Sequence, residues 1–181
     1  MSEKTKYFET KRLILRKKEL SDAKQMFDNY CSKDKVTEFM SWSSHKSIDD
    51  TIDFLNNVVL PAYENNSAYD WAVVLKETNE VIGSIAGCKY DLEKKSAELG
   101  WVLDDRYWGQ GLMPEAATVI RDYLFSEGFV RVWAEHNVKN SKSGRVMQKI
   151  GMQHEGTLRK SAFNNKGELV DMEIYSIIKN D

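Results

Sequence analysis

The sequence predicts an α+β fold in three layers, with helices on the faces of a mixed, mainly antiparallel sheet. Strand-like and helix-like segments follow one another in the order β-α-α-β-β-β-α-β-α-β-β, which gives about seven strands and about four helices. Three consecutive strand-like segments, joined by short polar turns, predict antiparallel pairing in the middle of the chain. A length of 181 residues with 41% hydrophobic residues suits a single domain over residues 1–181.

The first half of the chain begins with one strand and two helices. The alternating segment RLILR (residues 12–16) predicts a half-buried strand, and apolar residues at helical spacing predict a helix over residues 23–30. A second helix begins near Ser47, which stands in capping-box spacing with Asp50. The segments DWAVVLK, VIGSIAGCKY and SAELGWVL then form the expected meander of three strands.

The second half alternates helices and strands. An apolar stripe over residues 116–124 predicts a helix, and Gly128 is typical of the position that follows a helix. VRVWAE predicts a strand, SGRVMQKI predicts a helix that ends at Gly151, and DMEIYSIIK predicts the last strand.

Composition argues against several classes of function. The 26 Lys and Arg residues against 28 Asp and Glu residues give a net charge of -2, without the basic excess of nucleic-acid-binding domains. The two cysteines and three histidines show neither metal-site nor disulfide-framework spacing. No apolar run approaches the roughly 20 residues that cross a bilayer, and no signal-peptide pattern is present. We therefore expect a cytoplasmic protein that binds no metal, nucleic acid or membrane.

The stretch DDRYWGQGLMPEA, which joins a strand to a helix, predicts a phosphate site. A phosphate at a helix N-terminus needs free backbone N–H groups and benefits from the helix dipole. Gly109 and Gly111 allow close approach and positive φ, Pro114 suits the first helical turn, and Arg106 can contact a phosphate oxygen. The dinucleotide fingerprint is excluded because Pro114 stands where its third glycine belongs. The alternative is an ordinary turn before a helix.

The motif Arg106-x-x-Gly109-Gln110-Gly111 resembles the acyl-CoA loop of the GNAT N-acetyltransferases, whose signature is Q/R-x-x-G-x-G/A. Three more stretches, ETKRLILRKKELSDA, NSKSGRVMQKIGMQHEG and DMEIYSII, resemble blocks of the subgroup that includes the ribosomal-protein N-terminal acetyltransferases. They follow that subgroup's order and cover nearly the whole chain. The resemblance implies a sheet that splays between its fourth and fifth strands, acetyl-CoA as cosubstrate, and direct acetyl transfer to a primary amine.

The resemblance also implies where the cofactor binds. The pantetheine arm would run beside the third meander strand, and the pyrophosphate would lie on the glycine loop. The implied cofactor-binding residues are Trp101, Val102, Leu103, Arg106, Trp108, Gly109, Gln110, Gly111, Leu112, Met113, Asn140 and Ser143. Trp108 is also expected to pack the loop against the body of the protein. Asn140 and Ser143 suit helix capping equally well, so the sequence leaves their roles open.

Glu98 and Ser143 are the candidate catalytic residues. A protonated amine has no lone pair for attack on a thioester, so the reaction needs a base or an amine that is already free. Glu98 is the candidate base because it shares a strand face with Gly100 and Val102, beside the expected cofactor arm. Ser143 is the candidate acid that protonates the departing thiolate. The alternatives are a solvated glutamate and a helix-capping serine.

Three aromatic residues near the first two helices, Tyr30, Phe39 and Trp42, are candidates for the wall of the acceptor pocket, with ordinary packing as the alternative. The leading functional hypothesis is acetyl transfer to an amine, with a protein N-terminus as one acceptor. A polyamine, amino sugar or amino acid is a second class of acceptor. A sensor that binds acyl-CoA without turnover is the alternative outside the enzymes. The sequence does not distinguish a monomer from a homodimer.

Overall fold

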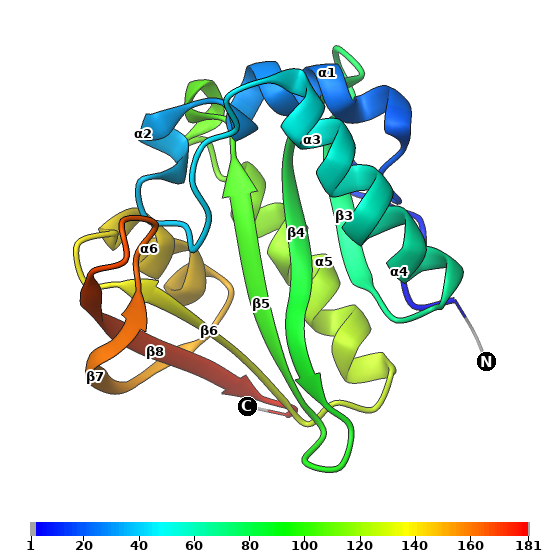
Figure 1. The fold of residues 1–181 in the computed structure, drawn as a ribbon. Helices are drawn as coiled ribbons and strands as arrows, with labels where there is room; N and C mark the ends of the chain where they lie inside the picture. Colours follow the sequence, from blue (N-terminus) through cyan, green and yellow to red (C-terminus); the bar gives the residue numbers. More distant parts are fainter. Residues whose placement is uncertain (1–2, 181) are drawn as a thin grey trace.

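The computed structural model describes residues 3–180, in which one sheet of eight strands has helices on both faces (Figure 1). The strands are β1 (Phe8–Glu9), β2 (Leu13–Arg16), β3 (Tyr69–Leu75), β4 (Glu80–Asp91), β5 (Ser96–Leu103), β6 (Arg131–Asn137), β7 (Gln153–Phe163) and β8 (Leu169–Ile178). Their order in the sheet is β1-β2-β3-β4-β5-β6-β8-β7. Every neighbouring pair is antiparallel except β5 and β6, which are parallel. The predicted fold class is confirmed, and the short edge strand β1 accounts for the strand beyond the expected seven.

The helical segments are shorter and more broken in the first half of the chain than in the second. They are η1 (Leu20–Asp22), α1 (Ala23–Met26), η2 (Phe27–Cys31), α2 (Asp34–Thr37), α3 (Ile48–Phe54), η3 (Leu55–Val59), α4 (Leu60–Glu64), η4 (Asp105–Tyr107), α5 (Leu112–Ser126) and α6 (Ser141–Lys149). The capping box at the start of α3 is confirmed, since Asp50 Oδ2 accepts the Ser47 backbone N–H at 3.0 Å. Helix α2 was not predicted, because a single turn leaves too little periodicity in the sequence.

Two apolar layers cover the sheet. Helix α5 lies on one face, and α1, α3 and α4 lie on the other (Figure 1). Because side chains alternate along a strand, Trp71 and Val73 of β3 join the cluster that includes α5, while Ala72 and Val74 join the cluster of the first helices. Because β3 is covered on both faces, the segment DWAVVLK is a nearly continuous apolar run.

Strands β5 and β6 separate soon after they begin. Their register pairs Ser96 with Arg131, Ala97 with Val132 and Glu98 with Trp133, and it ends there. Beyond Glu98, β5 remains paired with β4 only, and β6 remains paired with β8. The predicted splay is therefore confirmed, and the remainder of β5 has a free backbone edge on the β6 side.

Candidate active site

A cavity of about 610 Å³ lies at the end of β5. This volume is typical of small-molecule and cofactor sites. Three parts of the chain line the cavity: α2 and the residues around it, the end of β5 with the loop that opens α5, and the start of α6. The lining residues are Lys35, Val36, Glu38, Phe39, Met40, Trp101, Val102, Leu103, Tyr107, Trp108, Gly109, Gly111, Leu112, Met113, Pro114, Lys139, Asn140, Ser141, Lys142, Ser143, Arg145, Val146 and Lys149.

The glycine loop presents free backbone donors to this cavity. Gly109 has φ of 79° and Gly111 has φ of 76°, a conformation that other residues adopt only with strain. The N–H groups of residues 109–111 donate to no acceptor within residues 3–180. Gly111 is also the N-cap of α5, whose first turn leaves further N–H groups without helical partners. These donors and the positive end of the helix dipole suit an anion.

The segment that leads into β2 binds the glycine loop and the first turn of α5 through Thr10 and Arg12. Glu115, in the first turn of α5, accepts the Arg12 backbone N–H at 2.9 Å and the Thr10 hydroxyl at 2.5 Å. The Arg12 guanidinium pairs with the same carboxylate at 2.7 Å and donates to the Gln110 carbonyl at 2.9 Å. The Gln110 carbonyl is thereby fixed on the side of Arg12.

Basic side chains dominate the charged lining of the cavity. The lining contains Lys35, Lys139, Lys142, Arg145 and Lys149, against one acidic residue, Glu38. Apart from Lys35, these basic side chains form no ion pair within residues 3–180. The sequence analysis missed them, although Lys142, Arg145 and Lys149 recur at helical spacing in α6 and so gave a signal. A cavity with this charge suits the three phosphates of CoA.

Trp108 packs the loop against the body of the protein, as predicted. Its indole N–H donates to the Leu103 carbonyl at 2.7 Å, and its ring contacts both apolar clusters. Two lysines from different walls approach this ring: Lys142 Nζ lies 4.0 Å and Lys35 Nζ lies 5.4 Å from its centroid. Trp108 therefore links two helices that line the cavity, α2 through Lys35 and α6 through Lys142, at the glycine loop.

The predicted contact between the Arg106 side chain and a phosphate has no support in this geometry. Arg106 does not line the cavity, and its guanidinium is bound by Asp104, Glu80 and Asn29. Gln110 is also absent from the cavity lining, and its side-chain amide donates to the Arg106 carbonyl at 3.0 Å. Neighbouring carboxylates pair with the Arg106 guanidinium, and of the four named motif residues only Gly109 and Gly111 line the cavity.

Two of the three predicted acceptor-pocket aromatics do not reach the cavity. Tyr30 is 2% exposed inside the core cluster of the first helices. Trp42 is half-buried, packs on the same cluster, and has its ring centroid 5.6 Å from that of His45. Phe39 does line the cavity. The prediction for Tyr30 is wrong because η2 directs this side chain into the core between the first helices and the sheet, where it is buried.

Asn140 and Ser143 lie together at the start of α6. The Asn140 side chain caps the helix by accepting the Ser143 backbone N–H at 3.4 Å, so the capping role left open by the sequence is present. Both residues also line the cavity. The Ser143 hydroxyl makes no hydrogen bond within residues 3–180 and is free to meet a ligand.

Glu98 lies on the sheet outside the cavity lining. Its side chain is mostly buried, and Oε2 lies 3.2 Å from Lys89 Nζ. Val102, four residues further on the same strand face, lines the cavity about 13 Å away along the strand. Burial and the charge of Glu98 raise the pKa of Glu135 on β6, which places a second carboxyl group near the point of separation. Sequence reasoning missed Glu135.

A family model described as the acetyltransferase (GNAT) domain matches residues 12–153. The chain belongs to the GNAT family. It is an N-acetyltransferase, and acetyl-CoA is its cosubstrate. The free loop amides and the unpaired α6 cations fit this polyanion.

Relatives and solved structures agree with the family assignment. A Bacillus licheniformis protein, named uncharacterized N-acetyltransferase p20, is 32% identical, and the match covers 95% of this chain and 96% of the relative. A GNAT acetyltransferase from Bacillus anthracis superposes with a TM-score of 0.84 at 29% identity, covering 97% of this chain and 100% of that structure. The ribosomal-protein-S5-alanine acetyltransferase of Vibrio fischeri gives a TM-score of 0.82 at 25% identity, covering 97% and 98%.

Among residues 3–180, no cluster of three or more His, Cys, Asp or Glu side chains could hold a metal ion. Within the same range, no helix has the length and apolar character needed to span a bilayer.

Replacing Lys142 or Arg145 by glutamine should weaken CoA binding by about 3- to 10-fold for each charge, because each side chain loses an attraction to phosphate. Isothermal titration with CoA measures the effect, which should shrink as salt rises. Lys24→Gln is the control, since Lys24 of α1 pairs with Asp28 of η2 outside the cavity. Unchanged affinity in both α6 variants would exclude this wall from cofactor binding.

Proposed function

We propose that this enzyme acetylates the N-terminal amine of a protein, with the pyrophosphate of acetyl-CoA on the glycine loop and the thioester near Ser143. One observation supports the arrangement above all others. The anion-binding loop, the free end of β5 and the unbonded Ser143 hydroxyl face one continuous cavity. A single extended cofactor can therefore contact all three.

The free edge of β5 supports a place for the pantetheine arm. Residues 99–103 pair with β4 and have no strand on the other side. An amide-containing arm can hydrogen-bond to such an edge as an added strand would. Trp101, Val102 and Leu103 all line the cavity beside it. A backbone N–H on this edge is also the candidate donor for the oxyanion that forms when the amine attacks the thioester.

Ser143 is proposed to protonate the departing thiolate. Its hydroxyl is unoccupied and faces the cavity, while its backbone N–H is committed to the Asn140 cap. The cap therefore fixes the position of the residue without engaging its hydroxyl. The start of α6 also favours negative charge on the sulfur through the helix dipole.

Glu98 is proposed to accept the proton of the attacking amine, directly or through one water. We propose that the acceptor amine binds between Glu98 and Val102, on the face of β5 beside the split, because about 13 Å of strand separates these two residues. The nearby Glu135 makes this face attractive to an ammonium group. Lys89 pairs with Glu98 and lies mostly exposed, so an incoming cation can displace it.

The choice of acceptor rests on likeness and on acid–base chemistry. The Vibrio fischeri structure is of an acetyltransferase named for the ribosomal protein S5 and alanine. An N-terminal amine has a pKa of about 7.7 to 8.0, against about 10.4 for lysine, so more of it is free near neutral pH. A small amine is the second candidate, favoured by the two carboxyl groups near the split.

The proposal is tested by CoA release from acetyl-CoA with a panel of acceptors. Peptides that begin with alanine or serine should give turnover, and the same peptides with a blocked N-terminus and an internal lysine should not. Turnover only with polyamines, amino sugars or amino acids would replace the protein N-terminus by a small acceptor. Saturable binding of acetyl-CoA without CoA release from any amine would indicate a sensor and contradict both.

Glu98→Gln should lower kcat by about 5- to 10-fold at pH 7, because only about a tenth to a sixth of an N-terminal amine with a pKa of about 7.7 to 8.0 is free at that pH and the remainder needs a base. The defect should shrink as the pH rises toward the pKa of the acceptor amine, since a free amine needs no base. A pH profile of kcat measures this, with the CoA dissociation constant as the control that should stay unchanged. A defect of equal size at all pH values would contradict the role of base.

A further inference from the structure

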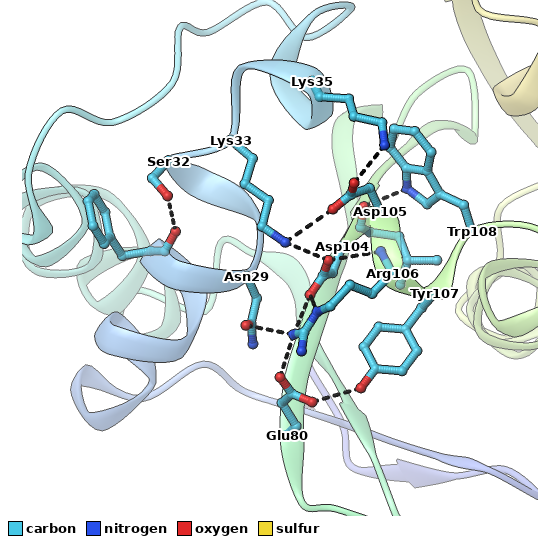
Figure 2. Close-up of polar contacts among 12 residues, drawn as sticks. Asn29, Ser32, Lys33, Lys35, Glu80, Asp104, Asp105, Arg106, Tyr107 and Trp108 are labelled. Carbon is cyan, nitrogen blue, oxygen red and sulfur yellow. Dashed lines mark hydrogen bonds and ion pairs between the residues drawn. The ribbon is translucent and has the colours of Figure 1, made fainter.

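Charged side chains join the residue before α2 to the turn that begins the glycine loop (Figure 2). We call Lys33, Glu80, Asp104 and Arg106 the Asp104 cluster. These residues come from three places: the start of α2, the start of β4 and the turn after β5. None of them lines the cavity, although the elements on either side of the cluster do.

Asp104 is the centre of the cluster and is completely buried. Its carboxylate accepts the Arg106 backbone N–H at 3.1 Å and Arg106 Nε at 2.7 Å. It also pairs with Lys33 Nζ at 2.8 Å. A buried carboxylate is costly unless it is paired and hydrogen-bonded, and these bonds meet that need.

Arg106 extends the cluster away from Asp104. Its Nη2 donates to Glu80 Oε1 at 2.6 Å and to Asn29 Oδ1 at 2.8 Å. The other oxygen of Glu80 accepts the Tyr107 hydroxyl at 2.8 Å, so the turn is bound to β4 at two successive residues. Burial acts to raise the pKa of Glu80, but the hydrogen bonds from Arg106 and Tyr107 outweigh it, and that pKa is lowered.

Lys33 connects the turn to the opposite wall. Its ammonium bridges Asp104 at 2.8 Å and Asp105 at 3.1 Å, while its backbone immediately precedes α2. Residues in and after α2, among them Val36, Phe39 and Met40, line the cavity. Arg106 already gives Asp104 a cationic partner, so the distinctive contribution of Lys33 is the link to α2.

We propose that Lys33 and Arg106 are positioning residues, which act through Asp104 and Glu80 to hold the α2 wall and the glycine loop at the separation that acetyl-CoA requires. The inference rests on the cofactor site described above. It also gives the arginine of the loop motif a role that needs no phosphate contact from its side chain.

Variants with opposite changes of charge test this proposal. CoA is a polyanion, so charge alone predicts weaker binding for Lys33→Met but tighter binding for Asp104→Asn and Glu80→Gln. Positioning predicts weaker binding for all three, by about fivefold or more, because each removes a contact that holds the turn before the glycine loop: Lys33→Met the contact to α2, Asp104→Asn the buried centre, and Glu80→Gln the contact to β4. Isothermal titration with CoA measures the affinities at a temperature where thermal scans show each variant folded.

Lys24→Met is the matched control, because Lys24 of α1 forms an exposed ion pair with Asp28 of η2 and the change of charge equals that of Lys33→Met. Its CoA affinity should stay within about twofold of wild type. Lys33→Arg should recover much of the affinity that Lys33→Met loses. Glu80 is partly exposed, so Glu80→Gln decides the matter if Asp104→Asn does not fold.

The results distinguish failure of the cofactor site from failure of the positioning role. Wild-type protein that binds no CoA would remove the cofactor site itself. Wild-type binding with unchanged or tighter binding in Glu80→Gln would overturn the positioning role and leave the cofactor site intact. Weaker binding in both Glu80→Gln and Lys33→Met, with the control unchanged, is the expected result.

Discussion

Hydrogen bonding between β5 and β6 stops at Glu98, and the rest of the site depends on that separation. If the two parallel strands stayed paired, the edge of β5 would be satisfied and no wedge would open beside it. Because they part, residues 99–103 have no strand partner on the β6 side while β4 holds the strand in place on the other side. Helices α5 and α6 then begin on either side of the cavity, with Gly111 and Asn140 as their N-caps.

Electrostatics explains why this wedge suits a polyanion. The chain is slightly acidic as a whole, yet the charged lining of the cavity is mostly basic. Acidic groups are kept elsewhere: Asp104 is buried with Lys33 and Arg106, and Glu115 is held by Arg12. The free loop amides and the α6 cations therefore remain available to a ligand. Buried carboxylates here shape the loop, and exposed cations provide the attraction.

Much of the fold could be predicted from the sequence, because alternation in β2, the capping box at Ser47 and the glycines after α5 and α6 are local signals. The loop and Ser143 could be placed at one site because their motifs are continuous in sequence. Arg106 and Tyr30 could not be placed, since the direction of their side chains is decided by partners distant in the chain, namely Glu80 for the first and the core of the first helices for the second. Glu135 was missed because its neighbour Glu98 belongs to another strand.

The central claim is that the loop before α5 binds the pyrophosphate of acetyl-CoA, and a calorimetric titration with acetyl-CoA tests it most directly. The decisive variant is Gly111→Trp, which places a large side chain at a positive-φ position in the loop. NAD serves as the control ligand. The account predicts saturable acetyl-CoA binding by the wild type, loss of that binding in the variant, and no binding of NAD. Folded variant protein that binds acetyl-CoA as tightly as the wild type would contradict it.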